Sequence, residues 1–380
     1  MIGGPEVVLL TIVGFFQPTT EESNPLEQVY PEYYLRTPID HFHNDTRYEP
    51  HSNETFNLRY WFDATYYKEG GPVYVLTAGE SSGVERLSFL QKGIVHQLAK
   101  GTNGLAVVLE HRYYGQSLPV ADLSTKNLRF LSTEQAMADT AYFARNVVFS
   151  GLDHLDLTAP NNPYIAYGGS YAGAFVAILR KLYPATFHGA ISSSGVTAAV
   201  YDFWQYYEAA RVYGPRDCVR TTQKLTHIVD NIFLNASSYS GKLKEVFGLG
   251  NVTYDDDFAQ VLSGGISGLQ GSNWDPELNS PTFSEYCHNV SSPTLLYPST
   301  EILAGTVREL ISAGGYHEKE EALVTPFLNY IGYVNVTSVS DCRASGSSDD
   351  ECFSSHNSTY YAQDDITQTW RSWPYQFCTQ

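Results

Sequence analysis

The sequence has 380 residues, of which 43% are hydrophobic, so it can form one large folded core and a second unit. Its 41 acidic and 23 basic residues give a formal net charge of −18 without any cluster of lysine and arginine, which argues against a nucleic-acid-binding protein. The cysteines show no metal-like C-x-x-C spacing, and we expect neither a metal nor a cofactor.

The first 30 residues are predicted to be a signal-like or processed segment. Val7–Phe16 form an apolar run of signal-peptide length that is too short to span a bilayer. The run is an atypical signal, because Glu6 stands where a positive charge belongs and no lysine or arginine precedes it. Residues 17–30 are polar and rich in proline and glutamate, as in a linker. No other run could cross a membrane, so we expect no membrane partner.

Short segments in the first half predict β-strands. Residues 57–62 alternate apolar and polar side chains, as a half-exposed strand does, whereas 73–78, 105–109 and 164–167 are the continuous runs of buried strands. A helical pattern over 133–148 lies between them. Strands that alternate with helices predict an α/β fold, in which a parallel sheet is covered by helices.

From about residue 200 the pattern changes to aromatic-rich helical segments, such as 200–211 and 222–234, separated by Gly, Ser and Asn loops. We predict that residues 200–370 form a helical cap domain. Residues 31–199 would then be the N-terminal part of the core, and 371–380 the start of the return to it.

Sequons and cysteines indicate a secreted glycoprotein. The sequence contains seven Asn-x-Ser/Thr sequons, at Asn44, Asn53, Asn235, Asn251, Asn289, Asn335 and Asn357. Unused polar loops are the alternative explanation. Secretion predicts disulfide bonds, and five cysteines leave one unpaired. Cys342 and Cys352 flank a polar loop and are the expected bridge.

The strand over 164–167 leads directly into a candidate nucleophile, Ser170. Gly168 and Gly169 precede it, and an apolar helix over 174–182 follows. This order is typical of a nucleophile elbow, a turn so tight that the neighbours of the serine must be small. Residue 172 is Ala where the strict G-x-S-x-G pattern has Gly, and we expect Ala to be small enough. A turn without catalytic function is the alternative.

Two backbone N–H groups are predicted to stabilise an oxyanion beside Ser170. The N–H of Tyr171 lies at a helix N-terminus, where the helix dipole favours negative charge. The second donor should come from the loop after the strand over 73–78, where Gly79 permits a close backbone approach and Glu80 offers the next N–H. An ordinary Gly/Ser loop would show the same spacing.

Six ordered motifs resemble the prolyl carboxypeptidase/dipeptidyl peptidase II family of secreted serine peptidases. The likeness covers about residues 34–380, and the E-H-R-Y-Y-G motif is the most specific. The motifs are Pro38–Phe42 (P-I-D-H-F), Glu110–Gly115 (E-H-R-Y-Y-G), Leu128–Asp139, Gly169–Gly173 (G-S-Y-A-G), Ala190–Gly195 and Trp373–Thr379 (W-P-Y-Q-F-C-T).

The resemblance implies an α/β-hydrolase core with an inserted helical cap and catalysis through an acyl-enzyme on Ser170. It implies peptide substrates with proline or a small residue next to the scissile bond, in carboxypeptidase, dipeptidyl-peptidase or endopeptidase mode. It implies a secreted protein or one of a vacuolar or lysosome-like acid compartment. In this family the catalytic histidine lies after the cap, so His111 is expected to be structural. Glu110 and Arg112 are expected to form a charge-paired scaffold.

The resemblance also implies that the acid and the histidine follow the W-x-Y-Q-x-C-T motif, which here ends at Thr379. No histidine follows Asp364 or Asp365, so no pair in the required order occurs. We therefore expect a truncated chain in which the last core strands are missing, Cys378 lacks its partner and no histidine reaches Ser170. The alternatives to a peptidase are a non-catalytic fragment and an esterase on the same fold.

Overall fold

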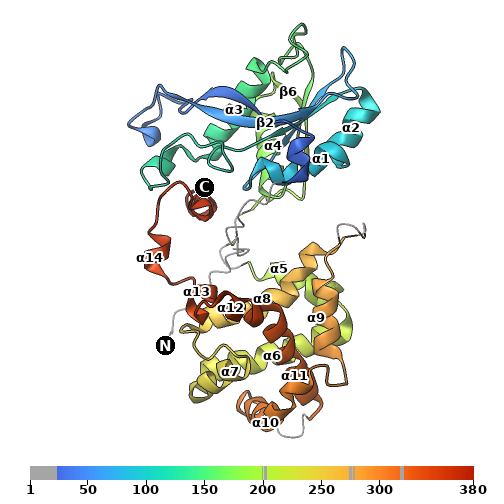
Figure 1. Ribbon diagram of the computed structural model, residues 1–380, viewed down its shortest axis with the longest axis vertical. Helices are drawn as coiled ribbons and strands as arrows, with labels where there is room; N and C mark the ends of the chain where they lie inside the picture. The colour runs from blue at the N-terminus through green and yellow to red at the C-terminus, as the bar shows by residue number, and fades with distance from the viewer. Residues whose placement is uncertain (1–23, 199, 201–202, 274–275, 277–278, 317–320) are drawn as a thin grey trace. The chain divides into compact units, whose positions relative to one another are not determined.

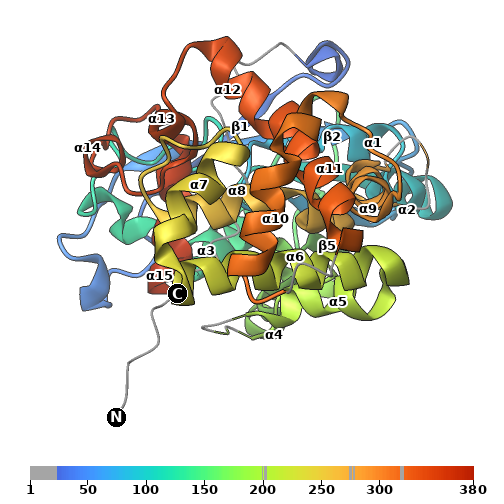
Figure 2. The same ribbon diagram turned by 90° about the horizontal axis from the view of Figure 1, so that it is seen from below.

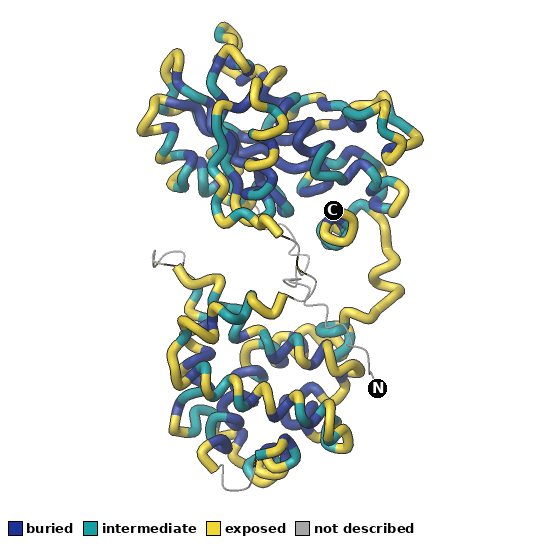
Figure 3. Tube along the Cα trace, turned by 180° about the vertical axis from the view of Figure 1, so that it is seen from behind, coloured by how far each residue is buried: buried dark blue, intermediate teal, exposed yellow. Residues whose placement is uncertain are grey.

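The computed structural model describes residues 24–198, 200, 203–273, 276, 279–316 and 321–380; the predicted signal run over 7–16 lies outside them. The chain divides into two compact units. The described part of the α/β unit lies within residues 24–198 and 359–380, and that of the helical unit lies within residues 200–358. Each unit has its own interior of buried residues (Figure 3).

A mixed six-stranded sheet forms the centre of the α/β unit, with the strand order β1-β2-β4-β3-β5-β6 (Figure 1). The strands are β1 Tyr33–Pro38, β2 Thr55–Asp63, β3 Val73–Thr77, β4 Leu105–Leu109, β5 Tyr164–Gly169 and β6 Phe187–Ser193. The four neighbouring strands β4, β3, β5 and β6 pair in parallel, as predicted. β1 and β2 differ from the prediction, because β1 pairs antiparallel with β2 and β2 antiparallel with β4.

β3 and β4, the central strands of the sheet, are buried on both faces. In β3, Val73 and Val75 belong to the interior shared with α3 and α4, whereas Tyr74 and Leu76 face the interior formed with α1 and α2. A strand buried on both faces has a continuous apolar sequence, which is why β3 and β4 could be predicted from their composition. The helices of this unit are α1 Ser88–Gln91, α2 Ile94–Thr102, α3 Thr133–Asn146, α4 Tyr171–Leu182, α14 Ser358–Tyr361, which begins at the boundary residue, and α15 Ser372–Thr379.

The prediction that β2 is half exposed is wrong. β2 lies between β1 and β4, and it buries four successive residues, Leu58–Trp61. The polar residue in this stretch, Arg59, is only 1% exposed because Glu110 pairs with it inside the unit. The alternating pattern therefore reflected a buried ion pair and not a solvent-facing edge.

Figure 2 labels the helices of the helical unit, α5 to α13, and their buried apolar side chains form one interior. Its helices are α5 Gln205–Tyr213, α6 Arg216–Asn235, α7 Ser240–Val246, α8 Asp255–Ser267, α9 Thr282–Ser291, α10 Ala304–Ala313, α11 Val324–Val334, α12 Ser340–Ser345 and α13 Asp349–Phe353. In α6 the buried residues Leu225, Ile228 and Ile232 recur at helical spacing, so they form one stripe that faces the interior. No helix in the described residues is both long and apolar enough to cross a membrane.

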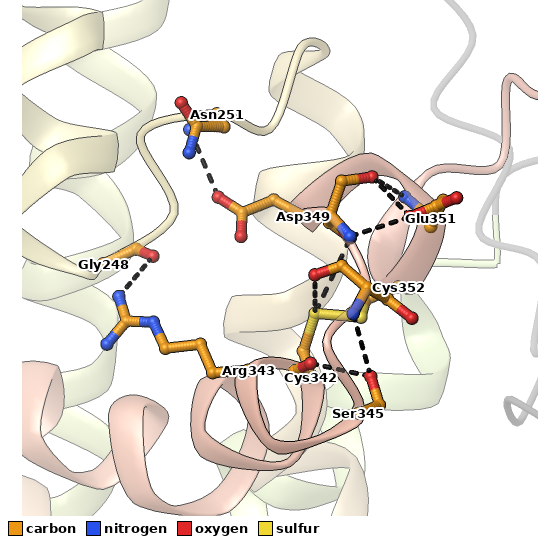
Figure 4. The surroundings of a disulfide bond; sticks show 10 residues. Gly248, Asn251, Cys342, Arg343, Ser345, Asp349, Glu351 and Cys352 are labelled. Atoms are coloured by element: carbon orange, nitrogen blue, oxygen red, sulfur yellow. Dashed lines mark hydrogen bonds between the residues drawn. A yellow bond between two sulfur atoms is a disulfide. The ribbon is translucent and has the colours of Figure 1, made fainter.

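Two disulfide bonds link helices of the helical unit. Cys218 of α6 is bonded to Cys287 of α9. The predicted bridge between Cys342 and Cys352 is confirmed and joins α12 to α13 (Figure 4). Cys378 in α15 is free and exposed.

Candidate active site

Ser170 occupies a strained turn between β5 and α4. Its backbone has φ 57° and ψ −125°, a conformation that costs a residue with a Cβ about 1–3 kcal/mol. The turn is held by two neighbours: the Ser170 N–H donates to the Ser193 carbonyl at 3.0 Å, and the Ser170 carbonyl accepts from the Gly173 N–H at 3.0 Å. The residue is exposed. This is the geometry of a nucleophile elbow.

The residues around Ser170 are small because backbone atoms crowd them. A Cβ on Gly168 would lie 2.1 Å from the Ala172 carbonyl oxygen, and one on Gly173 would lie 2.7 Å from that of Ser193. The Ala172 methyl is 3.0 Å from the position of a Cβ on Gly168 and 3.3 Å from that on Gly79. Gly168 and Gly79 have no side chain and therefore leave the space that the Ala172 methyl fills, which explains how the turn accommodates alanine at position 172.

The structure brings two of the predicted oxyanion residues to the elbow. Tyr171 is the first residue of α4, where N–H groups have no carbonyl partner within the helix. Gly79 follows β3, has φ +73° and abuts Ala172, so the backbone before Glu80 runs along the elbow. Burial raises the pKa of the Glu80 carboxyl above its ordinary value. The donation by Tyr171, Gly79 and Glu80 to an oxyanion stays a prediction.

The side chain of Tyr171 is fixed by residues from three other elements. Its hydroxyl oxygen lies 3.0 Å from Gln376 Nε2, 3.2 Å from His111 Nε2 and 3.2 Å from Thr133 Oγ1. The ring of Trp373 packs edge-on against that of Tyr171. Burial raises the pKa of the Tyr171 hydroxyl to about 12. Thr133 and Gln376 could not be recognised from the sequence as neighbours of the elbow, because they are 38 and 205 residues away from Tyr171.

His111 is neutral and cannot serve Ser170 as a base in this arrangement. Its Nδ1 lies 2.7 Å from the Arg112 carbonyl oxygen, which can only accept, so Nδ1 carries the proton. Nε2 is then an acceptor, and the Tyr171 hydroxyl donates to it. Burial lowers the pKa of His111 to about 4. Both ring nitrogens are engaged, as expected for a structural histidine.

Glu110 anchors three segments around a buried carboxylate. It forms an ion pair with Arg59 at 2.8 Å and accepts hydrogen bonds from the N–H groups of Gly83 and Ser117. A Cβ on Gly115 would lie 2.0 Å from Glu110 Oε1, so only glycine fits there. Glu110 thereby fixes the loop after β3, which carries Gly79 and Glu80.

Arg112 makes a second buried ion pair on the other side of the motif. Its Nε and Nη2 each lie 2.6 Å from an oxygen of Asp139 on α3. Its Nη1 donates to the carbonyl oxygens of Ile39 and Phe130. Glu110 and Arg112 are thus charge-paired as expected, although each pairs with a residue from another element.

The sequons differ in accessibility. Five asparagines are exposed: Asn44, Asn53, Asn235, Asn251 and Asn357. Asn335 is half-buried and donates to the Ile331 carbonyl at 2.8 Å. Asn289 of α9 is buried, and its amide nitrogen donates to the Glu285 carbonyl, so it is the least accessible of the seven in the folded helix. Modification of the seven asparagines stays a prediction.

No histidine is hydrogen-bonded to the Ser170 hydroxyl within the part of the chain that the structure describes. In the same residues, no strand follows β6. In the described residues, Ser170 is thus exposed on a strained turn with an ordered backbone around it, but no general base is hydrogen-bonded to its hydroxyl.

The mixed sheet, the flanking helices and the serine at the strand-to-helix turn define an α/β-hydrolase fold with a serine nucleophile position. A family model described as serine carboxypeptidase S28 matches residues 37–295. The chain belongs to this family.

The curated relatives are named as serine peptidases. A probable extracellular serine carboxypeptidase of Arthroderma benhamiae is 49% identical over 94% of this chain and 50% of its own length. The human lysosomal Pro-X carboxypeptidase is 34% identical over 50% of this chain and 35% of its own. The chain thus spans at most about half the length of these relatives. An acetylester hydrolase structure from Corynebacterium glutamicum has a TM-score of 0.34 at 12% identity, covering 83% of this chain and 74% of that one.

Proposed function

We propose that the protein is a serine-type exopeptidase that cleaves peptides next to proline or a small residue. The observation that carries the proposal is the exposed Ser170 on a strained turn at the start of α4. The names of the relatives, a serine carboxypeptidase and a Pro-X carboxypeptidase, support the peptide substrate and the proline preference. The fold by itself would also suit an esterase.

The proposed reaction begins when Ser170 Oγ attacks the carbonyl carbon of the scissile peptide bond. The carbonyl oxygen becomes negatively charged, and it accepts hydrogen bonds from the N–H of Tyr171 and from the Gly79–Glu80 backbone. A general base takes the proton of the Ser170 hydroxyl and gives it to the leaving amine as the bond to the amine breaks, and an ester to Ser170 remains. Water then hydrolyses this acyl-enzyme. A general base is required in both halves, and His111 does not supply it, because both of its nitrogens are engaged.

The two disulfide bonds support a location in an oxidising compartment, since such bonds persist in secreted proteins. The relative named as extracellular supports secretion, and the lysosomal relative supports an acid compartment. We propose secretion, with peptides as the partners.

The experiment compares a proline-containing dipeptide amide with a short-chain p-nitrophenyl ester as substrates of the protein as it is secreted. Turnover of the amide supports a peptidase, and turnover of the ester alone contradicts it. Ser170→Ala should lower turnover by about 10⁶-fold, as removal of a nucleophile does elsewhere. The matched control is His111→Gln, which should retain far more activity than Ser170→Ala. An equal loss in both variants would contradict a purely structural role for His111.

A polypeptide of these 380 residues alone is proposed to be a poor catalyst, because the described residues bring no histidine to Ser170. With only oxyanion donors and binding, its rate should be about 10³–10⁴ above that in water. A fluorophosphonate probe tests this, since labelling requires an activated serine. Rapid labelling of Ser170 in this polypeptide would contradict the proposal.

A further inference from the structure

A cluster of three metal-ligating side chains lies in the helical unit. Asp256 and Asp257 lie in the first turn of α8, and His356 belongs to the segment after α13, 100 residues after Asp256. One oxygen of each carboxylate and one ring nitrogen of His356 all lie within 4.8 Å of one another. His356 Nε2 is 2.8 Å from Asp256 Oδ2.

Asp257 has a buried oxygen without a partner. The residue is 3% exposed, and its Oδ1 accepts hydrogen bonds from the N–H and the hydroxyl of Ser355 at 2.9 and 2.8 Å. Its Oδ2 is buried and accepts no hydrogen bond from any described residue. Leaving a buried carboxylate oxygen unsatisfied is costly. A cation in this cluster would supply the missing partner.

The surrounding contacts hold the cluster in place. The ring of Tyr254 stacks on that of His356, with 3.8 Å between the centroids and 20° between the planes. The double hydrogen bond from Ser355 orients Asp257 from behind, as outer partners of metal ligands do. The orientation of two ligands is therefore fixed by neighbours that do not themselves bind.

The neighbouring acidic residues are engaged elsewhere. Asp255 forms an ion pair with Lys244 at 2.7 Å. Asp349 accepts from the Asn251 N–H, and Glu351 closes the capping box with Ser348 (Figure 4). In the described residues no lysine or arginine pairs with Asp256 or Asp257, so their charge is balanced only by His356 and the N-terminus of α8.

We propose that Asp256, Asp257 and His356 bind Zn²⁺. Two carboxylates and an imidazole suit zinc, whereas calcium and magnesium take oxygen ligands. Three protein ligands leave one position of a tetrahedral site for water. The ion would tie residues 354–357 to the start of α8, in addition to the disulfide between Cys342 and Cys352.

A second histidine–carboxylate cluster, Asp40 with His43 and His51, serves as an internal control. Both oxygens of Asp40 are already engaged: Oδ1 accepts from the Phe42 N–H and the Gln135 amide, and Oδ2 lies 2.7 Å from His51 Nδ1. This cluster therefore lacks the unpartnered oxygen that distinguishes Asp257.

The test titrates Zn²⁺ into chelator-treated protein by calorimetry, with circular dichroism to verify folding. Asp256→Asn and His356→Gln should each weaken binding at least about 10-fold, as loss even of an outer-shell partner does. His43→Gln should bind as the unmodified protein does, and Ca²⁺ should not compete. Hydrogen exchange in residues 354–357 should slow when Zn²⁺ is added. No stoichiometric binding, or equal affinity in all variants, overturns the proposal, and so does a loss confined to His43→Gln.

Discussion

Replacing Ser170 with glycine should stabilise the α/β unit while it removes the nucleophile. The positive φ of Ser170 costs about 1–3 kcal/mol, and glycine adopts this conformation without that strain. Glycine also increases the conformational entropy of the unfolded chain, which reduces the gain in the free energy of unfolding by about 0.4–1 kcal/mol. The Ser170 hydroxyl has no hydrogen bond among the described residues, so its loss adds no further cost. The two contributions together give an expected net gain of about 0–2.6 kcal/mol in the free energy of unfolding.

Hydrogen exchange in β3 and β5 measures this gain, because the amides at the centre of the sheet exchange only when the unit opens. This readout reports on the α/β unit alone, whereas a single thermal transition of a chain with two units would not. Ser170→Ala is the matched control, since it removes the same hydroxyl but keeps the Cβ and therefore the strain. Its stability should stay within about 0.5 kcal/mol of the unmodified protein. If Ser170→Gly is no more stable than Ser170→Ala, the turn is not strained and the argument fails.

Three further predictions use the same exchange measurement. Glu110→Gln should cost about 3–5 kcal/mol in the free energy of unfolding, because it removes the buried carboxylate that pairs with the buried Arg59. Glu32→Gln removes only the half-exposed partner of the same arginine and should cost less than about 1 kcal/mol. Similar losses in the two variants would contradict the burial argument. His111 takes up a proton near pH 6.5 in the unfolded state but only near about pH 4 in the folded state, so this group lowers the stability of the protein as the pH falls through that window. The difference in stability between His111→Gln and the unmodified protein should therefore change with pH in this window. A difference that stays constant would refute the prediction. Gly173→Val should disrupt the elbow, since its Cβ would meet two backbone atoms within 3 Å. The control Gly101→Ala, which places a methyl group in open space on α2, should increase the free energy of unfolding by about 0.5–1 kcal/mol. A stable Gly173→Val variant would exclude a tight turn.

The parts of the fold that depend on local sequence could be predicted. β3, β4 and β5 are short apolar runs, and the start of α4 follows the small residues around Ser170 directly. Burial on both faces and the steric limits of a tight turn act over a few residues, so they leave a signal in the sequence.

The parts that depend on distant partners could not be predicted. The burial of Arg59 depends on Glu110, 51 residues later, and without that partner an arginine in a strand indicates exposure. The antiparallel direction of β1 and β2 follows from chain connections that periodicity does not encode. The disulfide between Cys218 and Cys287 spans 69 residues and joins two helices, whereas the predicted bridge spans only 10.

The E-H-R motif at the end of β4 shows why residue type alone does not identify a catalytic group. Glu110, His111 and Arg112 are all titratable, and His111 contacts the residue next to the candidate nucleophile. Their partners decide their roles: the two charged residues are neutralised by buried ion pairs, and the histidine is held neutral between a carbonyl and a tyrosine hydroxyl. Each of the three fixes a different segment, namely the loop after β3, Tyr171 and α3. The elbow is thus supported from one strand end, and substitution of these residues should affect catalysis through the position of Tyr171 and Gly79 rather than through proton transfer.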